Sequence, residues 1–127
     1  DTLFNMALVH QSQNNHDQAL KYHREALQMR ENHYSNGVHR DIIESLISTS
    51  RTLIDGAEYE EAAKLCNRAK SELEKMRWTN ESLYGSCLHN LGCIYHKRGS
   101  LNESMESLLK ALQIRQQSLP QYHLDVA

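Results

Sequence analysis

Three residues of types that bind metals, His89, Cys93 and His96, follow one another at intervals of four and three residues. On a helix these intervals place all three side chains on one face, where two imidazoles and a thiolate could ligate zinc. A tetrahedral site needs a fourth ligand, and the nearby Cys87 points to another side of the same helix. Structural zinc sites usually draw their ligands from two separate elements, so we expect no metal site here.

The sequence contains none of the short motifs that indicate common catalytic sites. It has no glycine-rich phosphate loop, no Gly-x-Ser-x-Gly elbow and no His-Glu-x-x-His motif. The cysteines lack a sequence setting that would lower a thiol pKa, and Cys66 occupies a position typical of a small buried apolar residue. We therefore expect a protein that is not an enzyme and that uses no cofactor.

Composition and charge narrow the classes of partner. Lysine and arginine number 14 against 16 aspartates and glutamates, so the chain lacks the basic excess that favours nucleic acid. It contains no run of about 18 apolar residues and no charged-then-apolar leader, so we expect neither a membrane span nor a signal peptide. Three cysteines without framework spacing fit a reducing compartment, and we expect a cytoplasmic protein.

One pattern of large and small residues occurs three times and fills most of the chain. Its columns hold, in order, a large apolar residue, a small one, a large one and two small ones. The copies are Leu3, Ala7, His10, Ala19 and Ala26; Leu46, Ser50, Leu53, Ala62 and Ala69; and Leu88, Gly92, Tyr95, Ser104 and Ala111. A period of this length is typical of a stacked array, in which each unit buries its apolar face against its neighbours.

The elements that carry this pattern are predicted to be helices. Apolar residues recur at intervals of three and four, and glycine and proline are scarce. Six helices in three hairpins are expected, and their approximate ranges are 1–13, 15–31, 41–54, 58–76, 81–97 and 101–118. Gly99 is expected to end a helix in a left-handed conformation. Capping boxes are expected where Asn15 pairs with Gln18 and where Ser100 pairs with Glu103.

The small residues have a steric role, because two antiparallel helices approach closely only where one presents no bulk. The expected facing pairs within the hairpins are Ala7 with Ala19, Ser50 with Ala62, and Gly92 with Ser104. The remaining small residues, Ala26, Ala69 and Ala111, are expected to admit the first helix of the next unit.

This arrangement resembles the tetratricopeptide repeat from Leu3 to Ala127. The third unit, with Asn90-Leu91-Gly92-Cys93-Ile94-Tyr95 and His123-Leu124-Asp125-Val126-Ala127, is similar to the long 42-residue repeats of kinesin light chains. His39-x-Asp41 recurs as His123-x-Asp125 two periods later, which supports the longer unit. We expect one domain over 1–127, with repeats at about 1–40, 41–82 and 83–124, and 125–127 starting a further repeat of a longer array.

The resemblance implies a right-handed α-solenoid whose first helices line a concave groove for an extended peptide or a partner helix. The residues that the resemblance places in or beside this groove are Phe4, Asn5, Leu8, Gln11, Ile47, Ser48, Arg51, Ile54, His89, Asn90, Cys93, His96 and Lys97. Asn5 and Asn90 occupy a column in which light-chain-type repeats often carry an asparagine that binds a peptide backbone, whereas the second unit has Ser48. With Arg51 and Lys97 as its positive groups, the groove suits an amphipathic segment better than a terminal carboxylate.

Two functions and one structural question stay open at this stage. The array is expected to be a scaffold that binds a protein or peptide, as part of an adaptor or signalling protein. The alternative is a structural or oligomerisation arm that self-associates through its repeat ends. His10 and His23 are expected between the helices of the first hairpin, where each is either buried and neutral, with a lowered pKa, or partly exposed.

Overall fold

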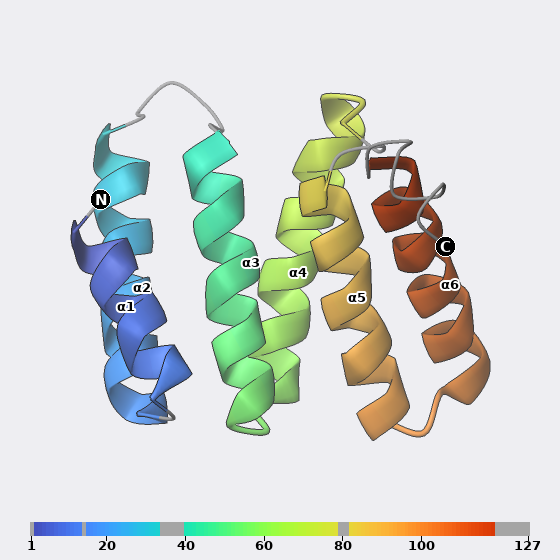
Figure 1. The fold of residues 1–127 in the computed structure, drawn as a ribbon, viewed down its shortest axis with the longest axis horizontal. Helices are drawn as coiled ribbons and strands as arrows, with labels where there is room; N and C mark the ends of the chain where they lie inside the picture. The colour runs from blue at the N-terminus through green and yellow to red at the C-terminus, as the bar shows by residue number, and fades with distance from the viewer. Residues whose placement is uncertain (1, 14, 34–39, 79–81, 119–127) are drawn as a thin grey trace, which may run out of the picture.

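A computed structural model shows six helices packed in three consecutive hairpins along the long axis of the molecule (Figure 1). The structure describes residues 2–13, 15–33, 40–78 and 82–118. The helices are α1 (Thr2–Ser12), α2 (His16–His33), α3 (Arg40–Asp55), α4 (Tyr59–Lys75), α5 (Ser82–Lys97) and α6 (Leu101–Ser118). The all-α class and the three hairpins are confirmed, and each described helix end lies within two residues of its predicted position.

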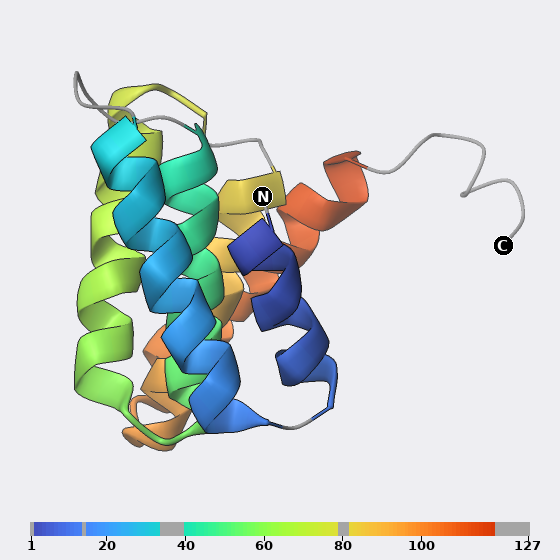
Figure 2. The same cartoon turned by 90° about the vertical axis from the view of Figure 1, so that its left-hand side faces the viewer.

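Some of the sequence features used above lie outside the described residues. They are the residue His39 and the segment 119–127 that contains the second His-x-Asp pair. Within the described part of the chain, α3 has a central position, since it packs against α2, α4 and α5. The turned view shows the first hairpin stacked in front of the other two (Figure 2).

The small residues bring the two helices of each hairpin together as expected. Ala7, Ala19, Ser50 and Ala62 are fully buried. In the third hairpin the hydroxyl of Ser104 donates a hydrogen bond of 2.8 Å to the carbonyl of Gly92. A Cβ atom on Gly92 would lie 2.6 Å from Cδ2 of Leu108, so α5 and α6 leave no room for a side chain at this point.

The helix ends follow the prediction in part. Gly99 has the expected positive φ, 82°, and the chain turns there from α5 to α6. Among the described residues, the side-chain hydrogen bonds of the two expected capping boxes are not formed. The carbonyls of Asn15 and Ser100 accept the N–H groups of Ala19 and Ser104, both at 2.9 Å, as the carbonyl of an N-cap residue does. The side-chain Nδ2 of Asn15 lies 3.3 Å from Nδ1 of His10.

The apolar core is unevenly distributed along the array. One continuous cluster of buried apolar residues runs from Ile42 to Ile114 and so joins α3 to α6. The junction between the first hairpin and α3 instead contains five buried polar residues, namely His23, Arg30, Ser45, Thr49 and Thr52. Leu20 and Leu27 add apolar contacts to the cluster at its edge. The first hairpin is therefore held to the rest of the chain by a largely polar interface.

Arg30 is the main polar contact of that interface. Its Nη1 donates to the Asp41 carbonyl at 2.8 Å, to the Ser45 hydroxyl at 2.9 Å and to a Glu44 carboxylate oxygen at 3.1 Å. Its guanidinium also lies 4.4 Å from the centre of the Phe4 ring. These partners make burial of the charge tolerable, because a buried cation is stable only when it is paired and hydrogen-bonded.

Candidate functional site

The residues predicted to line the groove fall into an accessible group and a buried group. We call the accessible group the first-helix face, since all of its members lie on α1, α3 and α5, the first helices of the hairpins. Its residues, which are at least partly exposed, are Asn5, Leu8, Gln11, Ser48, Arg51, His89, Cys93, His96 and Lys97. The first-helix face is a mixture of amides, one exposed leucine, imidazoles and cations.

Phe4, Ile47 and Ile54 differ from the prediction, because their side chains are buried within the array. Phe4 packs edge-on against the His23 ring, with 5.5 Å between ring centroids. Ile47 and Ile54 belong to the apolar cluster that joins α3 to α6. Burying such a side chain stabilises the fold by about 1.5–3 kcal/mol, which outweighs leaving it exposed to a partner. These three residues support the face rather than form its surface.

Asn90 also differs from its expected role. Only 4% of the residue is exposed, and its Nδ2 donates a hydrogen bond of 3.2 Å to the carbonyl of Ile47. The amide therefore joins α5 to α3. Asn5, in the same column of the first unit, is exposed. Of the two asparagines expected to bind a peptide backbone, Asn5 is the accessible one.

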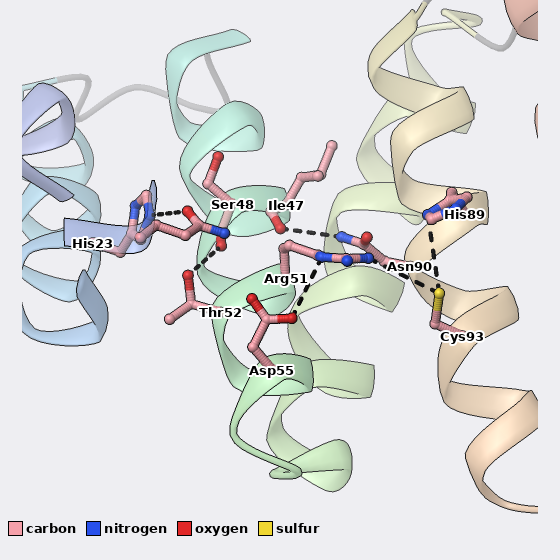
Figure 3. Close-up of polar contacts among 10 residues, drawn as sticks. His23, Ile47, Ser48, Arg51, Thr52, Asp55, His89, Asn90 and Cys93 are labelled. Atoms are coloured by element: carbon pink, nitrogen blue, oxygen red, sulfur yellow. Dashed lines mark hydrogen bonds and ion pairs between the residues drawn. The ribbon is translucent and has the colours of Figure 1, made fainter. Parts of the chain in front are cut away.

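Arg51 lies at the centre of the first-helix face, between α3 and α5 (Figure 3). Its Nε is 3.7 Å from Oδ1 of Asp55, and its Nη1 is 4.0 Å from Sγ of Cys93. Both distances exceed that of a charge-assisted hydrogen bond, so these contacts leave donors of the guanidinium for a ligand. The side chain of Arg51 is 43% exposed. It is thus an accessible positive charge in the middle of the array.

His89 contributes a neutral group beside this charge. Burial lowers the pKa of His89 below its usual 6.5, and the neighbouring cations Arg51 and Arg115 lower that pKa further. Its Nδ1 lies 4.0 Å from Sγ of Cys93. Arg51 therefore faces a neutral imidazole and a thiol on α5, and the positive potential at His89 comes from Arg51 and Arg115.

The histidines and the cysteine of the face are residues of the types that ligate zinc. Among the described residues, no group of three or more histidine, cysteine, aspartate or glutamate side chains is placed to hold a metal ion. His89 and Cys93 are neighbours, whereas His96 is exposed at the end of α5. The absence of a metal site stays an expectation from the sequence.

The two histidines of the first hairpin have different environments. His23 is fully buried, and its Nε2 lies 3.2 Å from Oε1 of Gln11, so Nε2 carries the proton. Burial, together with the charge of Arg30, lowers the pKa of His23 to about 4. His10 is partly exposed and stacks on Tyr22 with 5.4 Å between ring centroids. The buried alternative therefore holds for His23 and the exposed one for His10.

Sequence reasoning missed a cavity of about 400 Å³ between the first and second hairpins, which is lined by Gln11, His16, Ala19, Thr52 and Asp55. Gln11 was predicted to line the groove, whereas His16 and Thr52 were not singled out. The signal that could have found them is a comparison of each repeat column with its equivalents in the other repeats.

The helix α6 carries an exposed apolar stripe that no described element covers. Its residues, which are 49–64% exposed, are Leu101, Met105, Leu109 and Leu112. Their intervals of four, four and three place them on one side of the helix. Among the helices that the structure describes, none has both the length and the apolar character needed to cross a lipid bilayer.

Comparison with known proteins agrees with this architecture. Two family models, both described as tetratricopeptide repeat, match residues 1–75 and 85–125. The first match covers α1 to α4, and the second covers α5 from residue 85 onward and α6. No curated protein matches the chain.

Proposed function

The chain belongs to the tetratricopeptide repeat family of protein–protein interaction modules, and on that premise we propose that it binds a peptide segment or a partner helix on its first-helix face. The observation that carries the proposal is the position of Arg51, a half-exposed guanidinium on α3, the middle first helix. Its contacts to Asp55 and Cys93 are long, so it retains donors for a ligand.

The chemistry of the face indicates the kind of segment it would take. Leu8 is 43% exposed and offers apolar surface on α1. Asn5 is exposed, and its amide provides a donor and an acceptor together, which suits a main chain. Arg51 would meet a carboxylate or a carbonyl. An amphipathic segment with an acidic residue opposite Arg51 satisfies all three groups.

Selection from a library of short random peptides tests this proposal. Peptides selected on the wild-type protein should contain an acidic residue, and Arg51→Glu should weaken their binding at least about tenfold, because the attractive charge becomes repulsive. Asn5→Ala should weaken binding about threefold to tenfold through the lost hydrogen bonds. Glu60→Gln, an exposed position on α4, serves as a control for charge. Peptides that bind all variants equally well would rule out the first-helix face.

The stripe on α6 favours a second candidate function, a structural or oligomerisation arm. Four exposed apolar side chains on one side of a helix mark a contact surface for protein. If this is the main function, the protein should dimerise in a concentration-dependent manner, and Leu109→Glu should abolish the dimer. Light scattering over a range of concentrations distinguishes the two, since a monomer at all concentrations excludes self-association.

Three finer assignments belong to the same proposal. The spacing of 42 residues between Leu46 and Leu88 supports the long, kinesin-light-chain-like subtype, and with it a place in an adaptor or signalling protein. The cysteines Cys66, Cys87 and Cys93 are all free thiols, which supports the reducing conditions of the cytoplasm. The match to tetratricopeptide repeats, a family of scaffolds, supports a role without catalysis.

A further inference from the structure

The cavity between the first and second hairpins is built by three helices. Gln11 comes from the end of α1, His16 and Ala19 from the start of α2, and Thr52 and Asp55 from the end of α3. Gln11 also belongs to the first-helix face, so the cavity and the face are continuous. Its volume, about 400 Å³, is sufficient for one large side chain of a bound segment.

The repeat provides an internal comparison, because the next junction has the same positions with different residues. The equivalents of Gln11, His16, Ala19, Thr52 and Asp55 are Ile54, Tyr59, Ala62, Ile94 and Lys97. Ile54 and Ile94 are buried in the apolar cluster, and Tyr59 packs against it. Histidine, threonine and aspartate are smaller than tyrosine, isoleucine and lysine, so the side chains at these positions fill the first junction less than the second, and more of them are polar. We call the second one the filled junction.

The polar side chains that line the cavity have unused hydrogen-bond donors and acceptors. Oε1 of Gln11 accepts from His23, which leaves the amide NH₂ as a donor. The hydroxyl of Thr52 donates to the carbonyl of Ser48 at 3.1 Å, which leaves its oxygen as an acceptor. The ring of His16 lies directly against Gly56, where a Cβ atom would overlap it, so that wall of the cavity is fixed by contact with the turn after α3.

Asp55 gives the cavity its negative charge. Its carboxylate is 44% exposed, and its ion pair with Arg51 is long, at 3.7 Å, so most of its acceptor sites remain available. Figure 3 shows that Arg51 extends from α3 toward α5, whereas Thr52 points toward the first hairpin. Arg51 therefore reduces the negative charge of Asp55 without filling the cavity. The equivalent of Asp55 at the filled junction is Lys97, which has the opposite charge.

We propose that this cavity binds one basic side chain, preferentially arginine, of the segment that lies on the first-helix face; this inference rests on the proposed function. Asp55 attracts the cation, and the planar guanidinium can donate to Asp55 and Thr52 together, which an ammonium does less well. The amide of Gln11 donates to a main-chain carbonyl of the same residue. The partner segment therefore carries a basic residue for this cavity as well as an acidic one for Arg51.

Titration of the isotopically labelled protein with N-acetyl-arginine N-methylamide, followed by NMR, tests the proposal. The side-chain amide of Gln11 and the backbone amides of Thr52 and Gly56 should shift and saturate. Asp55→Asn should weaken binding about twofold to fivefold, as expected for loss of one partly exposed ion pair. Thr52→Ile, which copies Ile94 of the filled junction, should abolish the shifts. The equally blocked leucine should produce none, and Glu60→Gln should bind like the wild type.

Two outcomes overturn the proposal: no shift in the wild type, or equal binding by the wild type and Asp55→Asn. Asp55 is half-exposed, so this variant remains informative even if Thr52→Ile fails to fold. The titration needs no peptide, so its result is independent of the peptide selection. If the protein selects peptides through Arg51 but does not bind blocked arginine, the cavity proposal alone is wrong. If it binds blocked arginine at the cavity but selects no peptide, the proposed function is wrong.

Discussion

Acidification should destabilise the first hairpin through His23. The buried ring has a pKa of about 4 in the folded protein, against about 6.5 in the unfolded chain. Between these two values the unfolded chain binds a proton that the folded protein does not, so stability is full above pH 6.5 and falls as the pH falls toward 4. Lowering the pH from 7.5 to 5.0 should cost about 2 kcal/mol through this residue alone, from about 1.4 kcal/mol per pKa unit.

The environment of the His23 ring explains why stability falls on acidification. Protonation would place a positive charge at Nδ1, which has no hydrogen-bond partner among the described residues. The edge of Phe4 covers the ring, and the neighbouring charge, Arg30, is also positive. Gln11 offers an acceptor to Nε2, which is already satisfied in the neutral form. No carboxylate is among the causes that shift this pKa, so nothing offsets the desolvation of the charged ring.

Denaturation followed by circular dichroism at pH 7.5 and pH 5.0 measures the loss of stability on acidification. The informative quantity is the difference in this loss between the wild type and a variant. His23→Leu, which copies Leu108 of the third unit, should remove about 2 kcal/mol of the pH dependence. Comparison with the wild type is needed because His89, whose pKa is also lowered, contributes with the same sign. If the wild type and His23→Leu lose the same stability on acidification, the ring is not buried and neutral as described.

Four further substitutions test the packing, each by chemical denaturation. Gly92→Val should lower the free energy of unfolding by about 2–3 kcal/mol, because even a Cβ atom at this position would lie 2.6 Å from Leu108. An unchanged midpoint of denaturation would contradict the close approach of α5 and α6. Arg30→Ala should lower the free energy of unfolding by about 2 kcal/mol, because it removes the contacts to Ser45 and the Asp41 carbonyl. This loss is smaller than for a fully buried ion pair because Glu44 is half-exposed. An unchanged stability would show that the polar interface is not formed. Asn90→Ala should cost about 1–2 kcal/mol and Asn5→Ala less than about 0.5 kcal/mol, and equal effects would contradict their different burial.

The fold could be predicted from the sequence because the repeated small residues fit best where two helices approach closely. A small residue at every close approach, as at Ala62 and Gly92, fixes which helix faces pair. The helix ends follow from residues such as Gly99, whose positive φ favours glycine. These constraints are local, and they recur in each of the three repeats.

The candidate site was predicted less well, because a column of the repeat does not determine burial by itself. Phe4, Ile47 and His89 share one column, yet the two apolar residues are buried and the imidazole is only partly so. Positions at the border between the face and the neighbouring helix turn inward when burial of apolar surface is favourable. The chemical type of each side chain therefore decides whether a border position forms the surface of the site.

Arg30 and the cavity were missed for a related reason. Arg30 occupies the column of the buried Leu73, and a charged residue in that column implies polar partners on the facing helix. Ser45 and Glu44 are such partners, but periodicity alone does not pair α2 with α3 residue by residue. The cavity likewise results from several smaller residues acting together, and each of them is unremarkable in the sequence.

The central claim is that a ligand binds the first-helix face, and NMR mapping of a selected peptide tests it most directly. Addition of the peptide to the labelled protein should shift resonances of Leu8, Arg51 and His89, which lie on α1, α3 and α5. Resonances of the stripe on α6, such as Met105 and Leu109, should stay unchanged. Shifts confined to the α6 stripe, with the first-helix face unaffected, would contradict the account.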